Sequence, residues 1–122
     1  MPHCLIEYSD NVGAAADTRG LLAKVADKYR NSTGVFPTIG IRVRAIEIND
    51  YVVADGDPEN AFVHATCVVA PGRPEAVLGH FFNEMFEMMK QHLAPAARDR
   101  FLGLSLDVVE GNEGRSYKHN FG

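Results

Sequence analysis

Apolar and polar positions follow the same succession of patterns twice along the chain. Residues 4–8 (CLIEY) form a short apolar run that predicts a strand, closed by a polar turn. From about 14 to 30 the apolar positions recur at helical spacing, which predicts an amphipathic helix with Asp17 as its cap. Residues 39–48 return to alternation and predict a second strand. The apolar phase shifts near Ala45–Ile46, and we expect a β-bulge there.

The second half of the chain repeats this order, offset by about sixty residues. Residues 62–69 predict a buried strand, and Pro74 is well suited to the first position of a following helix. That helix carries a broad apolar stripe as far as about Leu93, and Pro95 ends it. Alternation over 102–109 then predicts a strand with one apolar face.

Two strand–helix–strand units, over about 2–48 and 61–110, predict a single domain that spans residues 1–122. Each unit most simply forms a parallel crossover, and joining the two edge to edge gives a four-stranded mixed sheet. The expected fold class is therefore α+β, a two-fold β-α-β pseudo-repeat with both helices on one face. In the C-terminal tail, 111–122, we expect a last short strand over 116–121.

The second face of this sheet stays open in the predicted arrangement. Phe62, Cys67 and Val69 indicate that it is not fully polar. A sheet with an uncovered apolar face calls for a partner subunit, so we expect an oligomer.

Composition and charge narrow the class of protein. Of 122 residues, 46% are hydrophobic and 23% charged, which is typical of globular proteins. The chain has no apolar run long enough to cross a membrane, and its N-terminus lacks the features of a signal peptide. A net charge of −4 argues against general nucleic-acid binding, and an anionic ligand would need a local arginine cluster.

Cys4 and Cys67 lie in apolar runs, and we interpret them as reduced core residues of a cytoplasmic protein.

The N-terminus carries the first candidate chemistry. If Met1 is removed, the nitrogen of Pro2 becomes a secondary amine that can accept a proton, whereas a retained Met1 leaves it an inert amide. Position alone favours no catalytic role, because a proline beside the start costs nothing structurally.

Arg42 lies early in a strand parallel to the first, and Arg73 lies in a turn where free N–H groups favour anions. By position, Arg42 is as well explained as a solvated strand residue like Arg44, and Arg73 as a turn residue without a role.

Several stretches of the sequence together form a more specific signature. They are PHCLIEYSDN, GVFPTIGIRVR, VADGDPENAFVHATCVVAPGR, FNEMFEMMKQHLAP, FLGLSLDVVE and the SYKHN of the tail. With the proline at position 2 and the paired arginines, they resemble the tautomerase superfamily and, within it, the 5-carboxymethyl-2-hydroxymuconate isomerase family. The resemblance covers nearly the whole chain.

This resemblance implies a homotrimer in which Pro2 serves as general base and Arg42 and Arg73 bind the substrate. It implies a cofactor-independent isomerisation of an unsaturated hydroxy-carboxylate in homoprotocatechuate degradation, with no metal, nucleotide or organic cofactor. The expected partners are this small anionic substrate and further copies of the chain, with no nucleic acid and no membrane. Two differences from the family leave the shape of the pocket open. The turn Ala70-Pro71-Gly72 lacks a second glycine that relatives usually have, and the tail is short.

Other functions stay open at this point. The scaffold could carry a different reaction, such as a phenylpyruvate-type tautomerase or a hydratase, or it could be a non-catalytic trimeric ligand-binding protein. His80, Glu84 and Glu87 have a spacing that a metal accepts, but a solvated helix face is far commoner. We interpret His64 as a satisfied core or interface histidine. Ser105 lies in no G-x-S-x-G motif, so a serine hydrolase is not supported.

Overall fold

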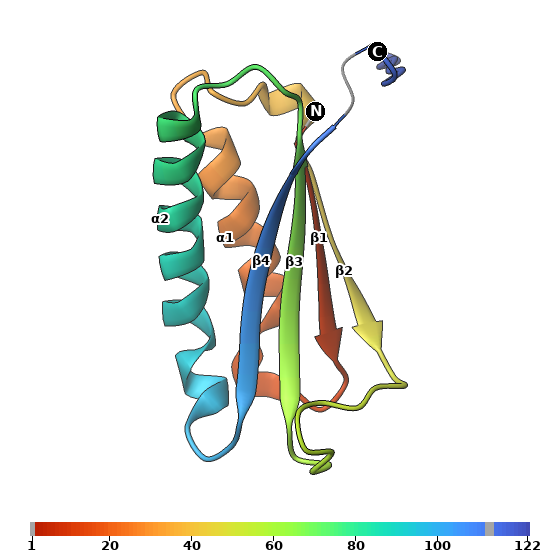
Figure 1. The fold of residues 1–122 in the computed structure, drawn as a ribbon, viewed down its shortest axis with the longest axis vertical. Coiled ribbons are helices and arrows are strands. Elements are labelled where there is room, and N and C mark those ends of the chain that lie inside the picture. The colour runs from red at the N-terminus through yellow and green to blue at the C-terminus, as the bar shows by residue number, and fades with distance from the viewer. Residues whose placement is uncertain (1, 112–113) are drawn as a thin grey trace.

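The computed structural model describes residues 2–111 and 114–122 and shows a four-stranded sheet with two helices on one face (Figure 1). The strands are β1 (His3–Ser9), β2 (Arg42–Ile48), β3 (Ala61–Val69) and β4 (Leu102–Glu110), and the helices are α1 (Thr18–Arg30) and α2 (Glu75–Leu93). Three short 3-10 helices, η1 (Ala14–Ala16), η2 (Thr38–Gly40) and η3 (Ala94–Ala97), lie between them.

The strands are ordered β2-β1-β3-β4 across the sheet. β1 is parallel to β2, β3 is parallel to β4, and the two central strands β1 and β3 are antiparallel. The predicted mixed sheet, made from two β-α-β units joined edge to edge, is therefore confirmed. This topology brings the starts of β1 and β2 and the ends of β3 and β4 to one end of the sheet. Both chain termini lie at that end (Figure 1).

Two local predictions were wrong. The pairing of β1 with β2 runs without interruption along β2, so there is no bulge near Ala45–Ile46. Ile46 instead shares the open face with Arg42 and Arg44, where an apolar residue interrupts the alternation without changing the register. Residues 116–121 form no strand. This polar segment passes over the end of the sheet and is joined to β2 by a side-chain hydrogen bond, from Arg42 to Asn120.

Local chemistry sets the helix ends close to their predicted positions. Asp17 caps α1 in a left-handed conformation, with a φ of 42°, and its carboxylate accepts a hydrogen bond from the Gly20 N–H at 3.1 Å. The residues just before Asp17, Ala14–Ala16, form the separate 3-10 helix η1 and are not part of α1. Pro74 is the cap of α2 and not its first residue, and Pro95 lies in η3, which follows α2 directly.

The core lies between the helices and one face of the sheet. Tyr29 from α1 packs against Phe81 and Phe82 from α2 and against Phe36, with ring centroids 5.1 to 6.4 Å from the Tyr29 ring. Aromatic rings bury large areas and pack at preferred angles, so this cluster fixes how the two helices sit together. The other large, almost fully buried side chains are Ile6, Leu21, Val25, Val63, Val69, Met85 and Met89.

Cys4 and Cys67 belong to this core. They lie opposite each other on β1 and β3, with their sulfurs 3.4 Å apart, and both are buried free thiols. The expected core position of both cysteines is therefore confirmed. Cys67 and Val69 face the helices, so their assignment to the open face was wrong, because strict alternation along β3 turns them away from Phe62, which does lie on the open face.

The open face nevertheless carries apolar side chains. Ile46, Val68 and Val109 are exposed on it, each from a different strand. Within residues 2–111 and 114–122, no helix combines the length and apolar character needed to cross a membrane.

Candidate active site

Pro2 lies at the end of the sheet where β1 and β2 begin. Its side chain is fully buried, and its carbonyl oxygen accepts a hydrogen bond from the Arg42 N–H at 3.0 Å. This bond extends the parallel ladder by one step and fixes the backbone of Pro2 against β2. Met1, whose removal the proposed chemistry requires, lies outside the described residues.

The backbone of Arg42 is hydrogen-bonded to that of Pro2, but the guanidinium of Arg42 contacts other groups. Nη1 donates to the carbonyl oxygens of Ile39 and Ile41, both at 3.0 Å, and Nη2 donates to Oδ1 of Asn120 at 3.3 Å. The side chain therefore links the loop before β2 to the C-terminal tail.

Arg73 is held in a similar way on the other side of the same end of the sheet. Nε donates to the Val35 carbonyl at 3.0 Å and Nη1 to the Ala70 carbonyl at 3.1 Å. The guanidinium also stacks 4.4 Å from the centre of the Phe36 ring, a cation–π contact. Gly72 adopts a φ of 107°, a conformation that favours glycine, and so allows the turn that returns Arg73 to Ala70.

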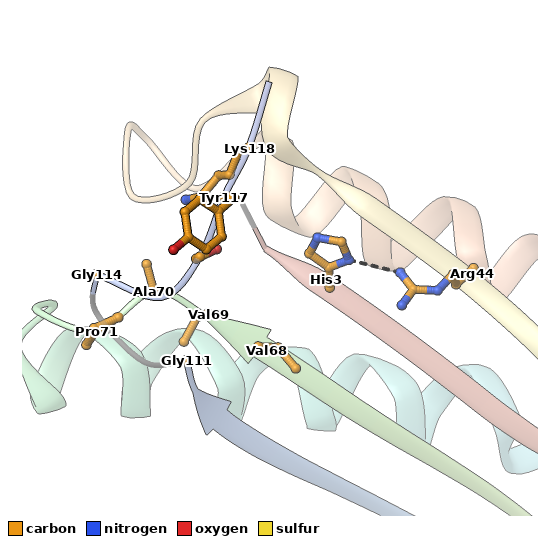
Figure 2. Close-up of a pocket in the computed structure, with 11 residues that line it drawn as sticks. His3, Arg44, Val68, Val69, Ala70, Pro71, Gly111, Gly114, Tyr117 and Lys118 are labelled. Carbon is orange, nitrogen blue, oxygen red and sulfur yellow. Dashed lines mark hydrogen bonds between the residues drawn. The ribbon is translucent and has the colours of Figure 1, made fainter. Parts of the chain in front are cut away.

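A cavity of about 590 Å³ opens at this end of the sheet (Figure 2). Its size is within the range of small-molecule sites. His3, the residue after Pro2, lines the cavity together with Arg44. The remaining lining residues come from the end of β3 and the turn after it, and from the tail: Val68, Val69, Ala70, Pro71, Gly111, Gly114, Ser116, Tyr117 and Lys118.

Arg44 is a site residue that the sequence pattern does not reveal. Its position in the strand predicts a solvated residue, whereas the structure places it in the cavity wall. Arg42 and Arg73 lie at the same end of the sheet as Pro2, yet neither lines this cavity in the described part of the chain. The signal that could have identified Arg44 is the pairing register, because Arg44 lies two residues after the residue opposite His3, on the same face.

Arg44 and His3 interact directly. Nη1 of Arg44 lies 3.0 Å from Nδ1 of His3 (Figure 2). Partial burial, followed by the positive charge of Arg44, lowers the pKa of His3 below its ordinary value, and Arg42 and Lys118 act in the same direction. The floor of the cavity is therefore rich in positive charge and favours an anion.

The turn before Arg73 and the C-terminal tail both contribute to this cavity. Ala70 and Pro71, from the turn, form part of its wall. Tyr117 and Lys118, from the tail, cross above it (Figure 2). The size and polarity of the pocket therefore depend on these two segments.

The remaining candidate clusters have structural partners. Glu84 pairs with Lys28, and Glu87 with Lys90. Nε2 of His80 lies 3.5 Å from Glu84. Over residues 2–111 and 114–122, no three His, Cys, Asp or Glu residues are grouped as a metal site would require.

His64 lies on the open face of β3 and is also satisfied. Its Nδ1 shares a 2.6 Å hydrogen bond with the hydroxyl of Ser105, and Nε2 lies 3.6 Å from a carboxylate oxygen of Asp107. The interpretation of His64 as a satisfied histidine is therefore confirmed.

Comparisons with known proteins agree with this architecture. A family model for 5-carboxymethyl-2-hydroxymuconate isomerase matches residues 2–121. The 5-carboxymethyl-2-hydroxymuconate Delta-isomerase of Escherichia coli is 36% identical over 120 residues, which cover 98% of this chain and 94% of that protein. The crystal structure of a 5-carboxymethyl-2-hydroxymuconate isomerase from Deinococcus radiodurans R1 superposes with a TM-score of 0.93 at 32% identity, covering 98% of this chain and 90% of the other.

The fold also extends to more distant proteins. A structure described as a fused 4-OT wild-type symmetric trimer superposes with a TM-score of 0.63 at 15% identity, covering 88% of this chain and 85% of that one, and shares the fold. The family match over nearly the full length and the 36% identity leave one conclusion. The chain belongs to the 5-carboxymethyl-2-hydroxymuconate isomerase family and is an isomerase.

Proposed function

We propose that this protein isomerises 5-carboxymethyl-2-hydroxymuconate, an unsaturated hydroxy-carboxylate of homoprotocatechuate degradation, with the nitrogen of Pro2 as general base. The observation that carries the proposal is the position of Pro2. It is fully buried and precedes His3, which lines a cavity together with the basic residues Arg44 and Lys118, and its carbonyl oxygen is hydrogen-bonded to the Arg42 N–H. The family match supplies the substrate class.

The chemistry needs one base that removes a proton at one carbon and returns it at another, so no external oxidant or reductant takes part. Such a base works best with a pKa near the working pH. An α-amino group in a peptide has a pKa of about 8, and nearby positive charge and desolvation lower such a value. Burial of Pro2 would supply the desolvation, and Arg44 and Lys118 in the cavity lining would supply the positive charge. By the family resemblance, we assign Arg42 and Arg73 to hold substrate carboxylates and to stabilise the dienolate that forms on deprotonation. This role requires each guanidinium to exchange the carbonyl oxygens that it contacts for the substrate.

We also propose that the enzyme acts as a homotrimer in the cytoplasm. The open sheet face with exposed Ile46, Val68 and Val109 supports assembly, and a structural neighbour is described as a symmetric trimer. Buried free thiols at Cys4 and Cys67 suit a reducing compartment.

The test combines intact mass with an ultraviolet assay of 5-carboxymethyl-2-hydroxymuconate isomerisation. We expect the mass to show that Met1 is removed, and we expect Pro2→Ala to lower kcat by at least about 100-fold, the usual contribution of a positioned base. Pro58→Ala is the matched control, because Pro58 is exposed in the loop between β2 and β3, at the other end of the sheet from Pro2. If wild-type protein without Met1 turns over nothing, the proposed reaction is wrong.

A further inference from the structure

We propose that Arg44, His3 and Lys118 form an anion subsite that binds a further carboxylate of the substrate and makes the enzyme selective for tricarboxylates. This inference rests on the proposed function and extends it. The three residues come from β2, β1 and the C-terminal tail, and all three line the cavity (Figure 2).

The contact between Arg44 and His3 leaves donors available for a ligand. A guanidinium has only donors, so the 3.0 Å contact makes Nδ1 of His3 an acceptor and places the ring proton on Nε2. A neutral ring is also what the lowered pKa of His3 favours. Arg44 uses one N–H in this contact, and its other N–H groups, together with the His3 Nε2–H, can donate to a carboxylate.

Arg44 differs from the two arginines that the sequence analysis favoured. The guanidiniums of Arg42 and Arg73 each donate to two backbone carbonyl oxygens. For Arg44, the described residues provide no backbone carbonyl and no carboxylate as a partner; its one described hydrogen-bond partner is His3. Of the three arginines, it is also the one that lines the cavity. Its N–H donors are therefore the least occupied by protein acceptors and the best placed for a ligand.

The chemistry of the proposed substrate provides a use for such a subsite. A muconate carries two carboxylates, and the carboxymethyl substituent adds a third. If Arg42 and Arg73 each hold one carboxylate, the third negative charge needs its own partners, because burying an unpaired carboxylate is costly. Lys118 lies above His3 in the tail and adds a second positive charge, beside that of Arg44, to the same cavity (Figure 2). The C-terminal tail thereby gains a role in substrate selection.

Binding of non-reacting acids tests the subsite apart from catalysis. Tricarballylate has three carboxylates and glutarate has two, and calorimetry on the intact protein measures the affinity of each. We expect Arg44→Ala to weaken tricarballylate binding by about tenfold or more, since hydrogen bonds between charged groups are among the stronger ones. Glutarate affinity should change by less than about twofold, because a lost charge acts weakly through solvent at a distance.

Arg98→Ala is the matched control. It also removes one arginine charge, but from a residue just after η3, at the opposite end of the sheet. The affinities for tricarballylate and for glutarate should both stay unchanged. Lys118→Ala provides a second variant in a segment outside the core, and we expect the same selective loss in smaller measure. In turnover, Arg44→Ala should raise KM for the tricarboxylate substrate with little change in kcat.

The outcomes separate this inference from the proposed function. If the wild type without Met1 binds tricarballylate selectively but turns over no substrate, the proposed reaction fails and the subsite stands. If the wild type is active and Arg44→Ala keeps the ratio of tricarballylate to glutarate affinity, the subsite is overturned. An equal loss for both acids would overturn it as well, because it would reflect general charge or a fold defect.

Discussion

Three arginines at one end of the sheet carry the same charge but are held in three different ways. Arg42 is bound to the loop before β2 and to Asn120, Arg73 to two loop carbonyls and an aromatic ring, and Arg44 to His3. The alternation of β2 places Arg42 and Arg44 on one face, and this was predictable. Which guanidinium enters the cavity depends on the neighbouring loop, the tail and the register with β1, none of which a single-strand pattern encodes.

The His3–Arg44 pair predicts a measurable titration. Partial burial and the charges of Arg44, Arg42 and Lys118 all disfavour the protonated ring, so the pKa of His3 should be below its ordinary value of about 6.5. Because the folded pKa is depressed, the unfolded chain binds this proton more readily. The free energy of unfolding should therefore fall as the pH decreases from about 6.5 through the lower pKa of His3 in the folded protein. Histidine NMR signals followed against pH give the value directly.

The same titration in Arg44→Ala identifies the cause. Removing the charge should raise the pKa of His3 toward the ordinary value, while the partial burial that remains keeps it from rising further. Arg98→Ala is the matched control, because it removes an arginine at the opposite end of the sheet. A His3 titration that is unchanged in Arg44→Ala would contradict the contact with Arg44.

At the scale of the elements, hydrophobic periodicity predicted four strands, two helices and their mixed pairing. The prediction succeeded because β1 and β3 are central strands: buried residues alternate along the whole of β3 and along β1 as far as Glu7. It failed in the less buried parts of the chain. Ile46 on the edge strand β2 interrupted the pattern, and the exposed tail over 116–121 makes side-chain and not ladder contacts. A hydrophobic pattern predicts a strand well only where one face of the strand is buried. Within one chain, β2 and residues 116–121 bury few side chains.

The start of α1 provides a sharp test of local structure. Replacing a helical glycine by alanine normally stabilises by about 1 kcal/mol. At Gly20, however, an added Cβ would lie 2.1 Å from Oδ2 of Asp17 and would displace the capping carboxylate. Loss of such a cap costs about 1 kcal/mol, so Gly20→Ala should be nearly neutral.

A double-mutant cycle isolates this effect. Asp17→Gly removes the carboxylate and suits the positive φ at that position, so in this background Gly20→Ala should stabilise by about 1 kcal/mol. Urea unfolding at a fixed protein concentration measures all four proteins. Equal effects of Gly20→Ala in both backgrounds would show that the cap and the glycine are independent.

For the whole molecule, the open sheet face and the site are connected through β2 and β3. Ile46 lies on the same face of β2 as Arg42 and Arg44, and Val68 of β3 both faces outward and lines the cavity. A subunit that covers this face would therefore reach the rim of the cavity. Assembly would then close the site as well as bury apolar surface.

This connection predicts that assembly and activity are lost together. Ile46 is 49% exposed in the single chain, so Ile46→Asp should leave the subunit folded. A buried carboxylate in a subunit interface is costly, however, and the variant should dissociate. Val52→Asp is the matched control, because Val52 is 85% exposed in the loop after β2. We expect sedimentation to show a trimer for the wild type and for Val52→Asp and a monomer for Ile46→Asp. Isomerase activity should be lost in the monomer alone.

A monomeric wild type that turns over substrate would remove the reason for the apolar open face. A trimeric Ile46→Asp would place the interface elsewhere on the molecule.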